Sequence, residues 1–64
     1  MKIKITAALP IEEKFRPKIG DIYEVKRTKL APNSRKRILL YYIDVNGTEV
    51  GVYAHSECEV IERD

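Results

Sequence analysis

The chain has 64 residues, and twelve Lys and Arg against ten Asp and Glu give a formal net charge of only +2 at pH 7. This length predicts a single small domain, residues 1–64, with a marginal core. The single cysteine excludes an internal disulfide, and one His with one Cys falls short of a four-ligand zinc site. We therefore expect a domain without metal or cofactor, stabilised by its apolar core.

Location can be predicted from the same features. A chain without a disulfide framework fits a reducing cytoplasm. At residues 1–9 the apolar side chains are interrupted by Lys2 and Lys4, unlike the continuous apolar segment of a signal peptide. No apolar run approaches the length of a membrane span. The expectation is a cytoplasmic protein that does not enter the membrane.

The N-terminal third predicts a strand followed by a helical turn. Alternation of Met1, Ile3 and Ile5 with the two lysines is typical of a strand with one buried face, and outward lysines suit an edge strand. After Pro10, residues 11–15 suit one or two helical turns, because proline is favoured at the first helical position and Glu12 and Glu13 favour the positive end of the helix dipole.

The middle of the chain predicts a strand and then a loop. Gly20-Asp21 is a turn signal, and residues 22–27 read as a strand with Tyr23 and Val25 on one face. Residues 28–34 contain Pro32, which cannot occupy a central strand, so this segment is expected to be a loop.

A hairpin at residues 38–53 is the strongest prediction. Two apolar, β-branched and aromatic runs flank Asn46-Gly47, the dipeptide favoured in a type I′ turn. A two-residue loop sets the register, which pairs 45 with 48, 43 with 50 and 41 with 52. One face then carries the better core candidates: Leu39, Tyr41, Ile43, Val50 and Val52. The second face carries Leu40, Tyr42, Asp44, Glu49, Gly51 and Tyr53.

The chain then predicts a tight turn at residues 54–57, of 3₁₀ type, and a last strand over 58–62. The sum is a mainly β fold of about five short strands with a short N-terminal helical turn. Sheets this small curl to hide their edges, which favours a small barrel.

Two stretches resemble SH3-like barrels. Residues 15–25 resemble the segment in which a Gly-Asp turn leads into a strand, and residues 51–61 resemble the closing segment of Gly-bearing strand, 3₁₀ turn and last strand. The resemblance implies an SH3-like small β-barrel. The chain has no tryptophan, and Ala54 stands where the peptide-binding family has its groove proline, so binding of proline-rich peptides is not expected. The chain also resembles short uncharacterised proteins encoded by phages and mobile elements of Gram-positive bacteria.

Charge is unevenly distributed and suggests one function. Six cations and no acid lie within residues 26–37: Lys26, Arg27, Lys29, Arg35, Lys36 and Arg37. Such a loop could follow a phosphate backbone while nearby tyrosines stack on bases. The alternative is a solvated loop, since the overall charge is far below that of strongly basic nucleic-acid binders.

The tyrosines suggest another function. Tyr42 and Tyr53 lie on the second face of the hairpin beside Gly51, where a ring could lie flat or a partner could approach closely. An exposed pair there, with Tyr23, would form a protein-binding surface. The alternative is that the N-terminal segment, through Leu9, Ile11 or Phe15, covers this face.

No catalytic constellation is recognised. His55, Ser56 and Glu57 are adjacent in a turn and do not converge as a triad requires, and Cys58 between two glutamates lacks an electropositive setting. The leading hypothesis is a non-enzymatic module that engages a protein partner, or itself, through a barrel face that bears Tyr42, Tyr53 and Tyr23 and through the adjoining loop. The alternative is a nucleic-acid-binding accessory protein that uses the basic loop 26–37.

Overall fold

The computed structural model describes the backbone of residues 1–33 and 36–63, and the side chains of these residues except 31–33, 36 and 37. The elements are, in order, β1 (Lys2–Ile5), the 3₁₀ helix η1 (Glu13–Phe15), β2 (Ile22–Glu24), β3 (Arg27–Asn33), β4 (Lys36–Val45), β5 (Thr48–Tyr53) and β6 (Cys58–Glu62). The predicted mainly β fold with a short N-terminal helical turn is confirmed, and the described residues contain six strands instead of about five.

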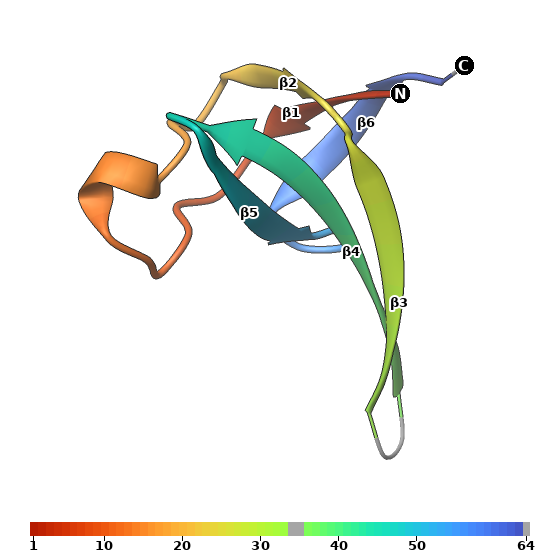
Figure 1. Ribbon diagram of the computed structural model, residues 1–64. Helices are drawn as coiled ribbons and strands as arrows, with labels where there is room; N and C mark the ends of the chain where they lie inside the picture. Colours follow the sequence, from red (N-terminus) through yellow and green to blue (C-terminus); the bar gives the residue numbers. More distant parts are fainter. Residues whose placement is uncertain (34–35, 64) are drawn as a thin grey trace.

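The strands form two three-stranded antiparallel sheets, in the order β2-β1-β6 and β3-β4-β5 (Figure 1). Over the described residues no ladder joins β5 to β6, so the sheets do not close into the predicted barrel. The turn at residues 54–57 lies between these two strands, and its groups bond back to the end of β5 and to the residue after β1. SH3-like kinship stays a prediction.

The chain changes sheets at a corner after β2. The Val25 N–H donates to the carbonyl oxygen of Met1 at 2.9 Å, in the first sheet, while the Lys26 N–H donates to that of Tyr42 at 2.8 Å, in the second. Adjacent residues are thus bonded to different sheets. The strand predicted over residues 22–27 is therefore divided between β2 and the start of β3.

The predicted loop at 28–34 is wrong in its described part, because β3 runs through it and pairs with β4 from Arg27↔Tyr42 to Asn33↔Lys36. Pro32 is tolerated because β3 is an edge strand, where a missing N–H need not break a ladder. Beyond the reach of β5, residues 30–33 and 36–39 continue as a two-stranded ribbon that projects from the body, hereafter the arm (Figure 1).

The predicted hairpin is confirmed. β4 and β5 pair with Val45↔Thr48, Ile43↔Val50 and Tyr41↔Val52. Both turn residues have the positive φ that a type I′ turn requires, +51° at Asn46 and +81° at Gly47. The side chain of Asn46 also donates to the carbonyl oxygen of Lys14 at 2.6 Å, which ties the turn to η1.

The core lies between the two sheets. Its buried apolar side chains come from both sheets and from the segment after β1, and they are Ile3, Ile5, Leu9, Tyr41, Ile43, Val45, Val50, Val52 and Cys58. β1 is the central strand of its sheet, so its prediction as an edge strand is wrong. The lysines instead mark the outer face, where Lys2 lies opposite Glu24 and Glu62, and Lys4 opposite Glu59.

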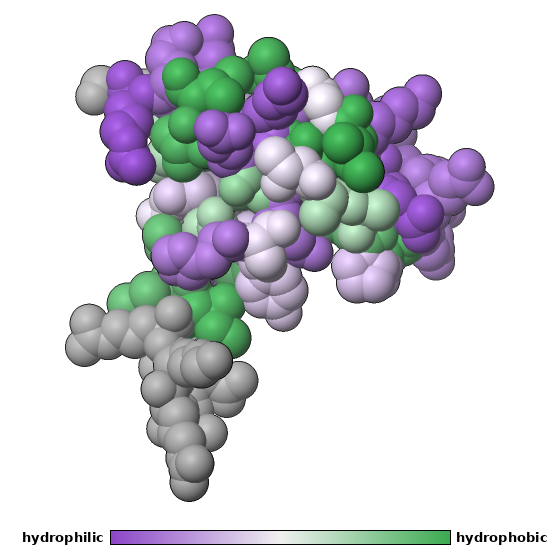
Figure 2. All heavy atoms as spheres, turned by 180° about the vertical axis from the view of Figure 1, so that it is seen from behind, coloured by the Kyte–Doolittle hydropathy of each residue, from purple (hydrophilic) through white to green (hydrophobic). Residues whose placement is uncertain are grey.

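The outer surface is mixed in character. In the view from behind, hydrophobic atoms form separate patches among hydrophilic ones (Figure 2). Exposed large apolar side chains occur on several elements, and Leu30 at the base of the arm is 50% exposed. No helix in the described part of the chain has the length and hydropathy to cross a membrane.

Candidate functional site

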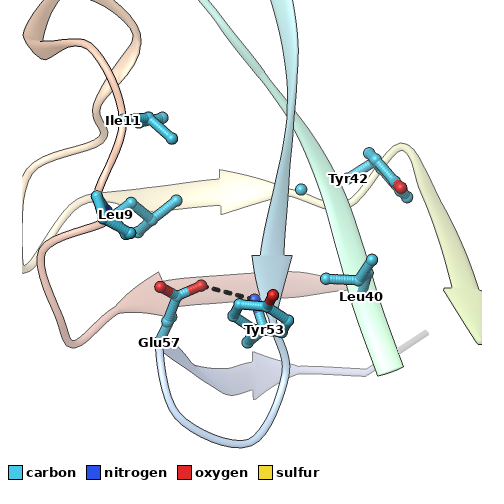
Figure 3. A pocket seen from close by; sticks show the side chains of 8 residues that line it. Leu9, Ile11, Leu40, Tyr42, Tyr53 and Glu57 are labelled. Carbon is cyan, nitrogen blue, oxygen red and sulfur yellow. Dashed lines mark hydrogen bonds between the residues drawn. The ribbon is translucent and has the colours of Figure 1, made fainter. Parts of the chain in front are cut away.

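The candidate site is a groove on the second face of the β4–β5 hairpin. Leu40 and Tyr42 line it from β4, Gly51 and Tyr53 from β5, and Leu9, Pro10 and Ile11 from the connection that follows β1. This connection lies on the side of β5 opposite to β4, so the strand runs between the two groups of side chains (Figure 3). Glu57 closes one end.

The groove has two hollows that share Ile11 and Gly51. The first, with the residues just named, has a volume of about 350 Å³. The second, about 400 Å³, continues toward the hairpin turn between Phe15 of η1 and Val50 of β5. Each volume lies within the range of small-molecule sites, but both hollows are open, which suits a chain segment that passes through.

The Tyr42 ring packs beside Gly51, which is one of the two arrangements that the sequence left open there. A Cβ atom on Gly51 would lie 3.2 Å from Cε1 of the Tyr42 ring, so a larger residue there would displace the ring. The guanidinium carbon of Arg27 lies 4.2 Å from the ring centroid, a cation–π contact. Arg27 then donates two hydrogen bonds to Oε1 of Glu49, at 3.0 Å from Nε and 2.6 Å from Nη2. Tyr42 is thus fixed by its neighbours across the sheet.

The hydrogen bonds from Arg27 hold the pKa of the Glu49 carboxyl below its usual value. Glu49 therefore stabilises the fold above its unfolded-state pKa, and this contribution is lost as pH falls through the lower folded-state pKa. In Arg27→Gln we expect the Glu49 pKa to rise toward its ordinary value, measured by NMR titration of the carboxyl carbon. Lys26→Gln, a neighbouring exposed cation, is the control. Equal Glu49 titration in both variants would contradict the assignment.

Tyr53 is held by Glu57 at the other end of the groove. The Tyr53 N–H donates to Oε1 of Glu57 at 2.9 Å, and the Glu57 N–H donates to the Tyr53 carbonyl oxygen at 3.1 Å. The carbonyl of Glu57 in turn accepts from the Thr6 N–H at 3.0 Å. Glu57 is 9% exposed, whereas Tyr53 is 46% exposed. The tyrosine ring is therefore presented to solvent on a fixed backbone.

The turn at residues 54–57 differs in type from the predicted 3₁₀ turn. Its hydrogen bond joins the Glu57 N–H to Tyr53, four residues back, where a 3₁₀ turn has three. His55 and Ser56 are exposed in this turn. Cys58 is buried, and burial, together with the charge of Glu57, raises the pKa of its thiol. This setting disfavours the reactive thiolate.

The other predicted site residues lie elsewhere. Tyr23 is in β2 of the other sheet, half-buried, with its hydroxyl 3.5 Å from Oδ2 of Asp21. Burial, followed by the charge of Asp21, raises the pKa of Tyr23. Lys26 and Lys29 are exposed at the corner and in β3. Arg35 and the side chains of Lys36 and Arg37 lie outside the described residues. The structure thus brings together Tyr42 and Tyr53, and Tyr23 does not line their groove.

The N-terminal connection forms one wall of the groove and leaves Tyr53 exposed to solvent. Leu9 is 2% exposed and belongs to the core, while Ile11 is half-buried beside Gly51. Sequence reasoning did not identify Glu57 as part of this face. The available signal was an acid four residues after a strand-end tyrosine, across a segment too short for a further strand.

Comparison with models of protein families, with curated proteins and with solved structures finds no match to this chain.

Proposed function

We propose that this chain is a non-enzymatic binding module that engages a protein partner, or a second copy of itself, through the groove between residues 9–15 and the second face of the β4–β5 hairpin. The groove carries the proposal because it combines an open channel, apolar walls and an exposed tyrosine on a fixed backbone. Tyrosine is enriched at protein interfaces because it offers a large rigid contact area and a polar tip.

The site is preorganised, which supports binding over a merely adaptable surface. Arg27 and Gly51 fix the Tyr42 ring, and Glu57 fixes the backbone at Tyr53. A partner that docks here therefore loses little entropy in ordering the Tyr42 ring and the backbone of β5 at Tyr53. SH3-like kinship and a cytoplasmic location belong to the same proposal.

Photo-cross-linking in the cells that produce the protein tests the groove as the binding site. A photoreactive diazirine amino acid replaces Tyr53. We expect a discrete protein adduct from Tyr53, and none of comparable yield from Ile22, which is 56% exposed on the other sheet. The Tyr53 adduct should decrease about tenfold or more when Tyr42→Ala is added, since truncation of a tyrosine at a binding hot spot costs about 2 kcal/mol or more. Equal adducts from both positions would refute the groove as the binding site.

The projecting arm favours a second candidate, nucleic-acid binding through the basic segment 26–37. A two-stranded β-ribbon fits the major groove of DNA, and Lys29 is exposed near the base of this ribbon. Arg27 is already paired with Glu49, so the contacts with phosphate groups would come from the other cations of this segment. In the same experiment, a photoreactive residue at Leu30 that forms a nucleic-acid adduct, with no protein adduct from Tyr53, would place this candidate first.

A further inference from the structure

One edge of the groove is an open β-strand edge. In a hairpin with a two-residue turn, the residues beside the turn exchange hydrogen bonds, and the pattern then alternates along the ladder. Val45↔Thr48, Ile43↔Val50 and Tyr41↔Val52 are the bonded pairs, and the Ala54 N–H, which donates to the carbonyl of Leu39 at 3.0 Å, continues the pattern. The backbone groups of Glu49, Gly51 and Tyr53 therefore point away from β4.

Only part of this edge is satisfied. Glu57 accepts from the Tyr53 N–H and donates to its carbonyl, which ends the edge at that residue. Within residues 1–33 and 36–63, the outward N–H and C=O of Glu49 and Gly51 have no hydrogen-bond partner. Ile11 lies beside this edge, but its N–H donates to Leu9 and its carbonyl accepts from Arg16, so neither bonds to β5.

The charged side chains that line the groove are all acidic, although the chain carries a net positive charge. Glu12 and Glu49 line the hollow near the hairpin turn, where Lys14 and Arg27 pair with them at 3.8 Å and 2.6 Å. Glu57 lies at the other end and, among the described residues, has no ion pair, so it is the carboxylate open to a cation of the partner. The side chains between them are mostly apolar. Such a channel complements a segment that carries apolar side chains and at least one Lys or Arg.

We propose that the groove takes an extended, basic and apolar segment of a partner protein, which adds as a strand to the free edge of β5 at Glu49 and Gly51. Main-chain hydrogen bonds supply register, and alternate side chains enter the two hollows beside Ile11, as in other cases of strand addition. This inference rests on the proposed function and names the conformation and charge of the partner segment.

The test uses a synthetic peptide of seven residues that alternates lysine with valine, acetylated and amidated at its ends. When this peptide is added to the ¹⁵N-labelled full chain, we expect the amide NMR signals of Gly51 and Tyr53 to shift. At nine-tenths saturation the amide protons of Glu49 and Gly51 should exchange about tenfold more slowly, because only the free protein then exchanges. A version with N-methyl groups along one edge should bind at least about tenfold more weakly, because it cannot donate main-chain hydrogen bonds to β5.

The outcomes separate this inference from the proposed function. Shifts in the groove without slower exchange at Glu49 and Gly51 would overturn strand addition and leave the groove as a binding site. Slower exchange in β3 instead would place the open edge on the other side of the sheet and also overturn it. Equal binding of a peptide that alternates glutamate with valine would overturn the charge assignment. Absence of all groove shifts at millimolar peptide would overturn the inference, while photo-cross-linking from Tyr53 still decides the proposed function independently.

Discussion

Replacing Ile43 with alanine is expected to unfold most of the protein at 25 °C without denaturant. Ile43 is fully buried at the centre of the hairpin, opposite Val50, within the cluster that both sheets share. Truncation of a buried isoleucine costs about 2–5 kcal/mol, because the transfer free energy is lost and a cavity remains. A single core in a chain of this size rarely supplies more than about 3–5 kcal/mol. The two quantities are comparable, so the folded population should collapse.

Urea denaturation followed by circular dichroism measures this effect. Ile22→Ala removes the same atoms from a side chain that is 56% exposed in β2 and is the matched control. We expect the control to lie within about 1 kcal/mol of the original protein, as substitutions at exposed positions usually do. Similar midpoints for the two variants would contradict the position of the core.

The hairpin could be predicted because its information is local. Asn46-Gly47 fixes the turn, the turn fixes the register, and the period of two fixes which side chains face the core. The contact of Tyr42 with Gly51 follows from the same register. Each step needs only residues that are close in sequence.

Elements whose local signals mislead, or whose neighbours are distant in sequence, were predicted less well. β3 pairs with β4 as locally as β4 pairs with β5, since Asn33↔Lys36 is as close in sequence as Val45↔Thr48. It was missed because Pro32 and Asn33 are typical of loops. Lysine alternation in β1 showed that one face is exposed, but it could not show that β1 has neighbours on both sides. Closure of the barrel likewise depends on whether β5 and β6 meet, which no local pattern reports.

The site shows the same division. Tyr42 and Tyr53 were predicted to share a face because both belong to the hairpin, whereas Tyr23 was grouped with them by residue type alone and lies in the other sheet. The roles of Leu9 and Ile11 depend on the path of the connection after β1, which carries no periodic pattern. Such contacts are set by the packing of the sheets.

Glu57→Ala is expected to destabilise the protein by about 1–3 kcal/mol, since a hydrogen bond to a charged group is lost and a backbone donor is left unpaired. The carboxylate accepts from the Tyr53 N–H at 2.9 Å in a position that is 9% exposed. The backbone bonds of residue 57 to Tyr53 and Thr6 remain in the variant. The loss should therefore be local, and hydrogen exchange at the Tyr53 amide should accelerate more than at Val52.

Two further variants separate the hydrogen bond from charge and position. Glu57→Gln retains a carbonyl oxygen that can accept the same bond, so it should recover part of the stability lost in Glu57→Ala. Glu59→Ala removes an exposed carboxylate two residues further on and should have little effect. If Glu57→Ala were as stable as Glu59→Ala, the carboxylate would not be what ends the open edge of β5 at Tyr53. If hydrogen exchange at the Tyr53 amide also stayed slow in Glu57→Ala, the Tyr53 N–H would have to donate to a different acceptor.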